Sequence, residues 1–198
     1  MKFATYSDLA LRTCSLSPRT GKDINLACLD MAALGLVGEA AEVQAALDPC
    51  IPTWVAGFDY MHLRKEVGDT LWYISLASRV LDSSLEEIAS QATGVWAVEF
   101  GDLKQPPETW YVKSLLGMLR SAGLFADEVK KILHHGHAVN TEKLTHLLVD
   151  TFFHLWQMCG NIPAWSVDLG SAADMNIERL RKRYPEGFRS EDSVNRVD

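Results

Sequence analysis

Four carboxylates that stand in pairs are the residues of this chain whose types and spacing best suit them to chemistry. Glu39 and Glu42 lie three positions apart in LGLVGEAAEVQ. Glu66 and Asp69 lie three positions apart in LRKEVGDTLWYISLAS. Residues three apart on a helix share a face, and the apolar flanks predict helices that bury most of their surface. Carboxylates crowded there would repel each other and lose hydration unless a cation lay between them, so the pattern predicts a site for a hard divalent cation, which prefers oxygen ligands.

Helices must position these carboxylates, because helical periodicity runs through almost the whole chain and strand signals are nearly absent. Prolines, glycines and an N-cap signature at 82–84 separate the helical segments. We therefore predict an all-α helical bundle. The expected helices are Tyr6–Leu16, Ile24–Ala46, Tyr60–Leu81, Leu85–Val98, Trp110–Leu133, Thr141–Cys159 and Ala172–Arg183.

The helical pattern occurs twice along the chain. The best internal boundary is 101–107, which contains two prolines and divides the sequence into one copy at 1–100 and another at 108–198. When Ala40 is aligned with Ala122 and Asp69 with Asp150, the helices of the two copies pair in the same order. The alignment predicts a tandem duplication, although any two amphipathic helical hairpins resemble each other to some degree. In this register Glu39, Glu42 and Glu66 correspond to Ser121, Leu124 and Leu147.

Composition narrows the class of protein. With 47% hydrophobic and 23% charged residues, the 198-residue chain is typical of a soluble globular protein. Its net charge of −7 argues against a nucleic-acid-binding surface. No apolar run is long and charge-free enough to predict a membrane span, and the N-terminus lacks the apolar core of a signal peptide. The four cysteines form no CxxC pair, which favours a reduced, cytoplasmic setting.

Several segments resemble one known family. The ExxE pair, the ExxD pair followed by LWY, the segment SLEEIA and the tail NIERLRKRYPEGFRSEDSVNR are similar to the MazG-like all-α nucleoside triphosphate pyrophosphohydrolases, a superfamily that includes MazG and the dimeric dUTPases. The similarity covers nearly the whole chain. Such proteins are common in phages and bacteria, so the cytoplasm, or the host cytoplasm for a phage-encoded chain, is the expected location.

The chain departs from the single-domain members of that family, in which SLEEIA runs directly into the tail. Here the second, acid-poor copy lies between these two segments. The resemblance therefore implies a MazG-like helical bundle in which two tandem copies form a pseudo-dimer within one chain. One working site would be assembled from both halves, with the acids from the first copy and the basic tail from the second.

The resemblance implies hydrolysis of nucleoside triphosphates, expected to be deoxynucleotides, to a nucleoside monophosphate and pyrophosphate. Glu39, Glu42, Glu66 and Asp69 would hold Mg²⁺, for which Mn²⁺ might serve as a substitute, and Glu39 or Glu42 would act as the catalytic base. Amide and guanidinium groups at helical spacing in the tail would bind the phosphates. These candidates are Asn176, Arg179 and Arg183, with Lys182 and Tyr184 as lesser ones. The implied role is control or cleansing of the nucleotide pool by a homodimer that engages neither nucleic acid nor membrane.

Other functions stay open at this point. A di-iron carboxylate protein needs Glu-x-x-His motifs, which neither Glu39 nor Glu66 begins. A catalytically retired relative would bind a nucleotide or a partner without cleavage. The acids would be plain surface charges in a third interpretation, which their apolar flanks oppose. The triplet His134, His135 and His137 has a zinc-site composition, but no acid or cysteine stands at ligand spacing, so a loop is expected; His62 is expected to be an ordinary helix-face residue.

Overall fold

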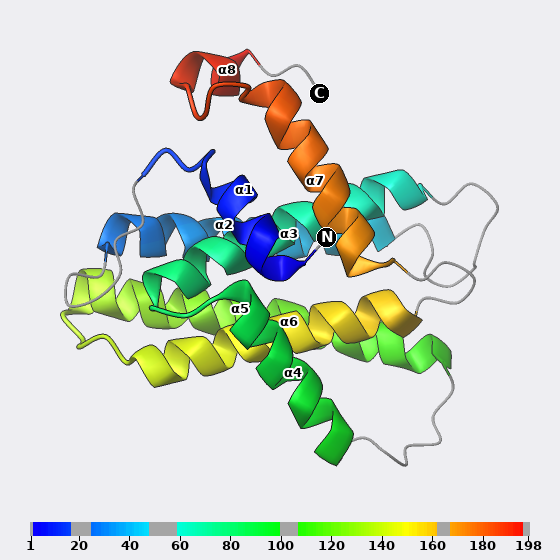
Figure 1. Ribbon diagram of the computed structural model, residues 1–198. Helices are drawn as coiled ribbons and strands as arrows, with labels where there is room; N and C mark the ends of the chain where they lie inside the picture. The colour runs from blue at the N-terminus through cyan, green and yellow to red at the C-terminus, as the bar shows by residue number, and fades with distance from the viewer. Residues whose placement is uncertain (1, 17–24, 48–58, 100–106, 162–166, 196–198) are drawn as a thin grey trace.

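The computed structural model describes residues 2–16, 25–47, 59–99, 107–161 and 167–195, and these residues form helices and connecting turns without a strand (Figure 1). The prediction of an all-α bundle is thereby confirmed. The helices of the described part are α1 (Phe3–Leu11), α2 (Leu26–Leu47), α3 (Tyr60–Val80), α4 (Leu85–Glu99), α5 (Pro107–His135), α6 (Thr141–Asn161), α7 (Leu169–Arg183) and α8 (Ser190–Val194).

The expected helix boundaries agree best where a side chain caps the helix. The Asp59 carboxylate accepts a hydrogen bond from the backbone N–H of His62 and starts α3 at the expected residue. At α4, the Ser84 hydroxyl accepts from the N–H of Glu87, whose carboxylate accepts from the N–H of Ser84. This reciprocal capping box was predicted from 82–84.

Differences occur at the chain ends. The first helix was expected at Tyr6–Leu16, but α1 starts and ends earlier. Its end coincides with a local hydrogen bond from the Thr13 hydroxyl to the carbonyl of Ala10, which competes with helical continuation. The expected start of the second helix, Ile24, lies outside the described residues. The short helix α8 was not predicted, because five residues are too few for a recognisable period.

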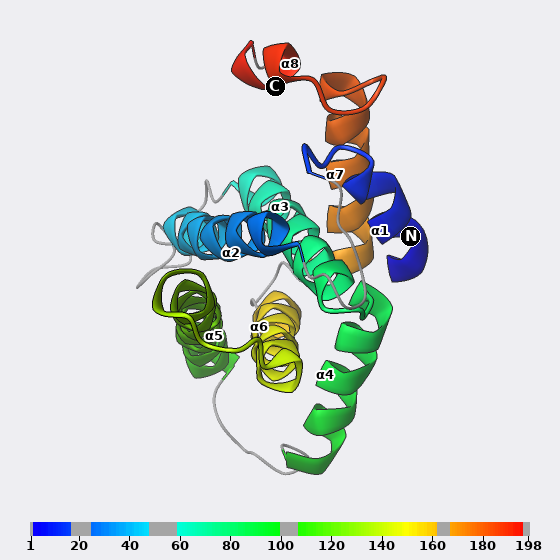
Figure 2. The same cartoon turned by 90° about the vertical axis from the view of Figure 1, so that its left-hand side faces the viewer.

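Two helical hairpins form the centre of the molecule. Helix α2 packs on α3, α5 packs on α6, and α2 lies against α5. Seen from the side in Figure 2, the first hairpin lies above the second, and α4 flanks α6. Fully buried apolar side chains from both hairpins fill the space between them, among them Leu36, Leu71, Met118 and Phe152. Within the described residues, no helix is long and apolar enough to cross a membrane.

Each hairpin is held together by one close glycine contact. A Cβ atom at Gly35 of α2 would overlap the ring of Tyr73 in α3. A Cβ atom at Gly117 of α5 would overlap the ring of His154 in α6. Since only glycine leaves room for these rings, both contacts set how closely the two helices of a hairpin approach.

Helices α1 and α7 complete the fold beside α3. Both contact α3 and each other, so the N-terminal helix and the C-terminal helix meet at the first hairpin. Figure 1 shows α7 rising from this junction toward α8. A Cβ atom at Gly68 of α3 would lie 2.9 Å from the carbonyl oxygen of Ala172 and 2.9 Å from Cβ of Asn176. The missing side chain at Gly68 thus lets α7 lie directly against the helix that carries Glu66 and Asp69.

Candidate functional site

Three glutamates from two helices form the acidic centre of the molecule. Glu39 and Glu42 project from α2 and Glu66 projects from α3. One carboxylate oxygen from each can be chosen so that all three lie within 4.8 Å of one another. Glu66 is fully buried, Glu39 is half-buried and Glu42 is exposed. We call these three residues the triglutamate cluster; its oxygen-only composition and spacing suit a hard divalent cation.

Two oxygens of the triglutamate cluster lack protein partners. Oε2 of Glu39 and Oε2 of Glu66 are buried without a hydrogen bond, an arrangement that costs free energy. Burial, followed by the charges of Asp69, Glu42 and Glu66, raises the pKa of Glu39 to about 8. Burial also raises the pKa of Glu66, against the lowering effect of Lys65. A cation bound among these oxygens would satisfy them and reverse both shifts, so the residues present fit a metal ion.

Asp69, the expected fourth metal ligand, lies beside this cluster but is tied to α7. Nη1 of Arg179 donates to both of its carboxylate oxygens, at 3.1 and 3.0 Å. Nδ2 of Asn176 donates to Oδ1 of Asp69 at 2.6 Å. The structure thus brings the second acid pair of the sequence into contact with the predicted phosphate-binding tail, across more than a hundred residues of chain.

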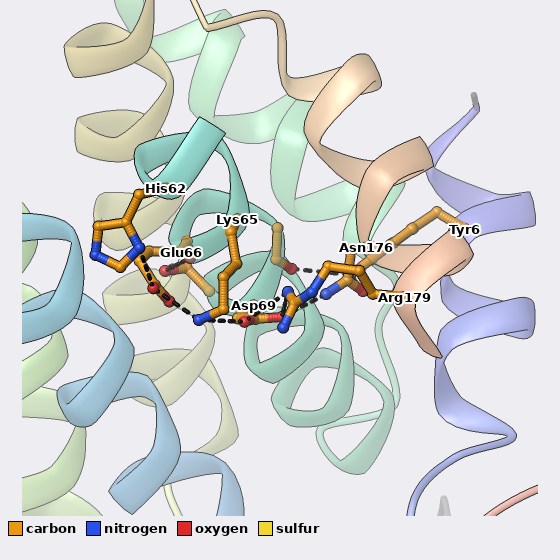
Figure 3. Close-up of polar contacts among 9 residues, drawn as sticks. Tyr6, His62, Lys65, Glu66, Asp69, Asn176 and Arg179 are labelled. Atoms are coloured by element: carbon orange, nitrogen blue, oxygen red, sulfur yellow. Dashed lines mark hydrogen bonds and ion pairs between the residues drawn. The ribbon is translucent and has the colours of Figure 1, made fainter. Parts of the chain in front are cut away.

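Two basic side chains that the sequence analysis did not select also contact the acids (Figure 3). Nζ of Lys65 lies 2.7 Å from Oε1 of Glu66 and 3.6 Å from Oδ2 of Asp69. Nδ1 of His62 lies 3.2 Å from the same oxygen of Glu66. Burial alone would lower the pKa of Lys65, but the hydrogen bond to Glu66 and the charge of Asp69 raise it. The i,i+4 spacings from His62 to Glu66 and from Lys65 to Asp69 were the available sequence signal.

A cavity of about 460 Å³ opens onto this site. Its acidic wall contains Glu39, Glu42 and Asp69. Its opposite wall is formed by residues of the C-terminal tail, and Lys65 lies between the two walls. Every predicted site residue lines the cavity except Glu66, which lies buried behind it, and Lys182, which is exposed outside it. The predicted tail residues that line it are Asn176, Arg179, Arg183 and Tyr184.

One part of the cavity is aromatic. Trp72, Tyr73, Tyr184 and Phe188 all line it. The indole of Trp72 is fixed, because its Nε1 is within hydrogen-bond distance of the Ala10 carbonyl at 3.1 Å. The rings of Trp72 and Tyr73 meet edge to face with centroids 4.9 Å apart. The sequence could not separate such residues from core aromatics, because both kinds recur at helical spacing.

The N-terminal helix supports the site from behind. The hydroxyl of Tyr6, in α1, lies 2.8 Å from Oδ1 of Asn176 and 3.1 Å from the carbonyl oxygen of Gly68. Burial, followed by the charge of Asp69, keeps the pKa of Tyr6 well above its usual value, so this hydroxyl retains its proton and donates. The sequence gave no sign of this role, since no local spacing connects residues that far apart.

The histidine triplet does not form a second metal centre. His134 and His135 occupy the last turn of α5, and His137 follows that helix. Apart from the triglutamate cluster, no group of three metal-ligating side chains comes together in the described part of the chain. The favourable position of histidine at a helix C-terminus accounts for the first two residues.

Comparison with known protein families, with curated proteins and with solved structures finds no match to this chain.

Proposed function

We propose that this protein hydrolyses nucleoside triphosphates, with deoxynucleotides expected, to a nucleoside monophosphate and pyrophosphate in a divalent-metal-dependent reaction. The observation that carries this proposal is the single cavity whose acidic wall faces a tail with an amide and two guanidinium groups. A triphosphate needs both, because its negative charges require a cation and several hydrogen-bond donors together. The expected metal is Mg²⁺, with Mn²⁺ as a substitute, and the expected role is control of the nucleotide pool by a MazG-like enzyme.

The triglutamate cluster would hold the cation, and Asp69 would complete its surroundings. When bound, the cation would neutralise phosphate oxygens and lower the pKa of a water molecule. Glu42 is the most exposed carboxylate of the cluster and lines the cavity with Glu39, so either can accept the proton of an attacking water. The water oxygen would then bond to phosphorus as the α–β anhydride bond breaks.

The tail would bind the phosphates from the other wall. Arg183 and Tyr184 line the cavity there. Arg179 uses Nη1 for Asp69, and a guanidinium has five N–H donors in total. Its position therefore suits a bridge between the acidic wall and a bound phosphate. The aromatic part of the cavity, with Trp72 and Tyr73, would take the nucleoside.

We also infer that the two hairpins descend from one hairpin and that the site is assembled from both halves of the chain. The alignment of Ala40 with Ala122 and of Asp69 with Asp150 also pairs Gly35 with Gly117 and Tyr73 with His154. These are the two pairs that make the close glycine contacts. Agreement in a contact that the alignment did not use supports the duplication. The tail then follows the second copy and returns through α7 to the acids of the first.

A product assay tests the proposed reaction. The purified protein is incubated with each common ribo- and deoxyribonucleoside triphosphate, with and without Mg²⁺, and the products are separated. We expect monophosphate and pyrophosphate that depend on the metal and are lost in Glu42→Gln. Glu178→Gln, which changes an exposed glutamate of α7 outside the cavity, is the matched control and should keep full activity.

Three results would contradict the proposal. Release of inorganic phosphate from the γ position would give a different reaction. Nucleotide binding without turnover would favour a retired enzyme. Iron in the purified protein, with the colour of a di-iron centre, would favour an oxidoreductase instead.

A further inference from the structure

The hydroxyl of Tyr6 ends a chain of hydrogen bonds that leads to the acids. We propose that Tyr6 is a positioning residue, which sets the amide of Asn176 and through it the carboxylate of Asp69 beside the triglutamate cluster (Figure 3). The importance of this alignment for catalysis rests on the proposed function, whereas its importance for metal binding rests only on the fit of the acids to a cation.

The chemistry of the amide explains why a donor is needed at Tyr6. Nδ2 of Asn176 donates to Asp69, so the opposite atom of the amide, Oδ1, must face Tyr6. A carboxylate accepts hydrogen bonds only, and a rotated amide would place its oxygen against the carboxylate. The Tyr6 hydroxyl donates to Oδ1 and thereby favours the orientation that leaves Nδ2 for Asp69. Tyr6 is fully buried and Asn176 is 2% exposed, so water cannot easily replace this bond.

Other contacts hold α1 in place, so the hydroxyl of Tyr6 is not needed for that purpose. The Ser7 and Ser75 hydroxyls lie 3.3 Å apart and join α1 to α3. The Trp72 indole donates to the carbonyl of Ala10 in the same helix. The ring of Tyr6 belongs to the apolar core, and phenylalanine would preserve that packing. Loss of the hydroxyl should therefore alter the orientation of Asn176 while α1 stays docked.

Tyr6→Phe is the variant that tests this role, with Ser7→Ala as its matched control. Each removes one buried hydroxyl that links α1 to α3, but only Tyr6 contacts Asn176. Mn²⁺ affinity is measured by calorimetry, and kcat and KM are measured with the preferred triphosphate. We expect Tyr6→Phe to lower metal affinity and kcat by about 10-fold, the effect typical of residues that orient metal ligands. Ser7→Ala should change neither, and both variants should keep the native helical content.

A double-mutant cycle distinguishes positioning from a general loss of packing. If Tyr6 acts through Asn176, the effect of Tyr6→Phe should largely disappear when Asn176→Ala is already present. Equal effects in both backgrounds would overturn the proposal. So would a Tyr6→Phe protein with the metal affinity of the wild type.

The metal titration keeps this test separate from the proposed reaction. If the wild type cleaves no triphosphate, the proposed function fails, and weaker Mn²⁺ binding by Tyr6→Phe than by Ser7→Ala would still support the positioning role. If the wild type cleaves triphosphates and Tyr6→Phe equals it in metal affinity and kcat, only the positioning role fails. A wild type that binds no Mn²⁺ would overturn both.

Discussion

The hairpin α2–α3 and the hairpin α5–α6 have nearly the same pattern of buried and exposed positions in the register that aligns Ala40 with Ala122 and Asp69 with Asp150. Large apolar side chains fill matching places in the core. Leu36 pairs with Met118, Val43 with Phe125 and Leu71 with Phe152, all of them buried. The two hairpins therefore solve the same packing problem with different side chains of similar character.

Their chemistry differs where the first hairpin places its glutamates. The position of Glu39 is taken by Ser121 in the second hairpin, and the position of Glu66 is taken by Leu147. The Ser121 hydroxyl lies 2.9 Å from Oγ1 of Thr151, so the two polar groups at this place satisfy each other. In the first hairpin, Oε2 of Glu39 and Oε2 of Glu66 have no such partner. One hairpin contributes stability, whereas the other retains costly buried acids, as functional sites commonly do.

The strongest way to break this contrast is to give the first hairpin the residue of the second. Glu66→Leu copies Leu147 and removes a buried carboxylate. We expect loss of metal binding and of activity, together with a metal-free protein that is more stable by about 1–4 kcal/mol, as when apolar residues replace buried charges. Isothermal titration and denaturant unfolding measure the two effects.

The reciprocal variant completes this test. Leu147→Glu buries a new charge and should lower the free energy of unfolding by about 2 kcal/mol or more. A Glu66→Leu protein that is less stable than the wild type would mean that Glu66 contributes to folding, and the contrast between the hairpins would be wrong.

Asp69 and Asp150 sharpen the contrast, because both hairpins keep an aspartate at this place. Lys65 lies 3.6 Å from Asp69 and His146 lies 3.5 Å from Asp150, each one helical turn earlier. Only Asp69 also contacts α7, through Asn176 and Arg179. We expect Asp69→Asn to lower kcat/KM by about 100-fold and Asp150→Asn to leave it unchanged. Equal losses in steady-state assays would assign a site to the second hairpin as well.

The paired glycines test the shared packing of the hairpins. Gly35→Ala and Gly117→Ala each introduce a Cβ atom that overlaps an aromatic ring, so each should destabilise the protein by about 1–3 kcal/mol. Only Gly35→Ala should also raise KM, because Tyr73 lines the cavity and His154 does not. Thermal unfolding gives the first quantity and substrate titration the second. A neutral effect of either alanine on stability would show that the hairpins differ in how tightly they pack.

The smallest expected effect is the pH dependence that Glu39 adds to the first hairpin alone. Its pKa of about 8 means that the folded, metal-free protein holds this proton more tightly than the unfolded chain. Its contribution to stability is therefore fully present below about 4.5 and is lost as pH rises through about 8. Metal affinity should rise over the same range, because the cation displaces the proton.

Glu39→Gln should flatten the fall in stability between these pH values, since glutamine does not titrate. Burial raises the pKa of Glu66 as well, so a smaller slope of the same sign should remain. Urea unfolding in a series of buffers measures this slope. A slope that is unchanged in Glu39→Gln would show that Glu39 is already ionised in the metal-free protein.

Local spacing determined much of this protein in advance. The periodicity of the chain specified α3, α4 and the all-α architecture, because helix formation and capping depend on residues within a few positions of each other. The same geometry predicted that Glu39 and Glu42 share one face and that Asn176, Arg179 and Arg183 share another. The structure places all five of these side chains around one cavity.

Tertiary structure alone decided which of these groups meet. The partners of Asp69 on α7, the Tyr6 hydroxyl behind Asn176 and the burial of Glu66 depend on how α1, α3 and α7 pack. The close approach of α7 depends on the absence of a side chain at Gly68. No periodic pattern records such contacts, because they join residues that are distant in the chain and become neighbours only when separate helices bury their apolar faces against each other.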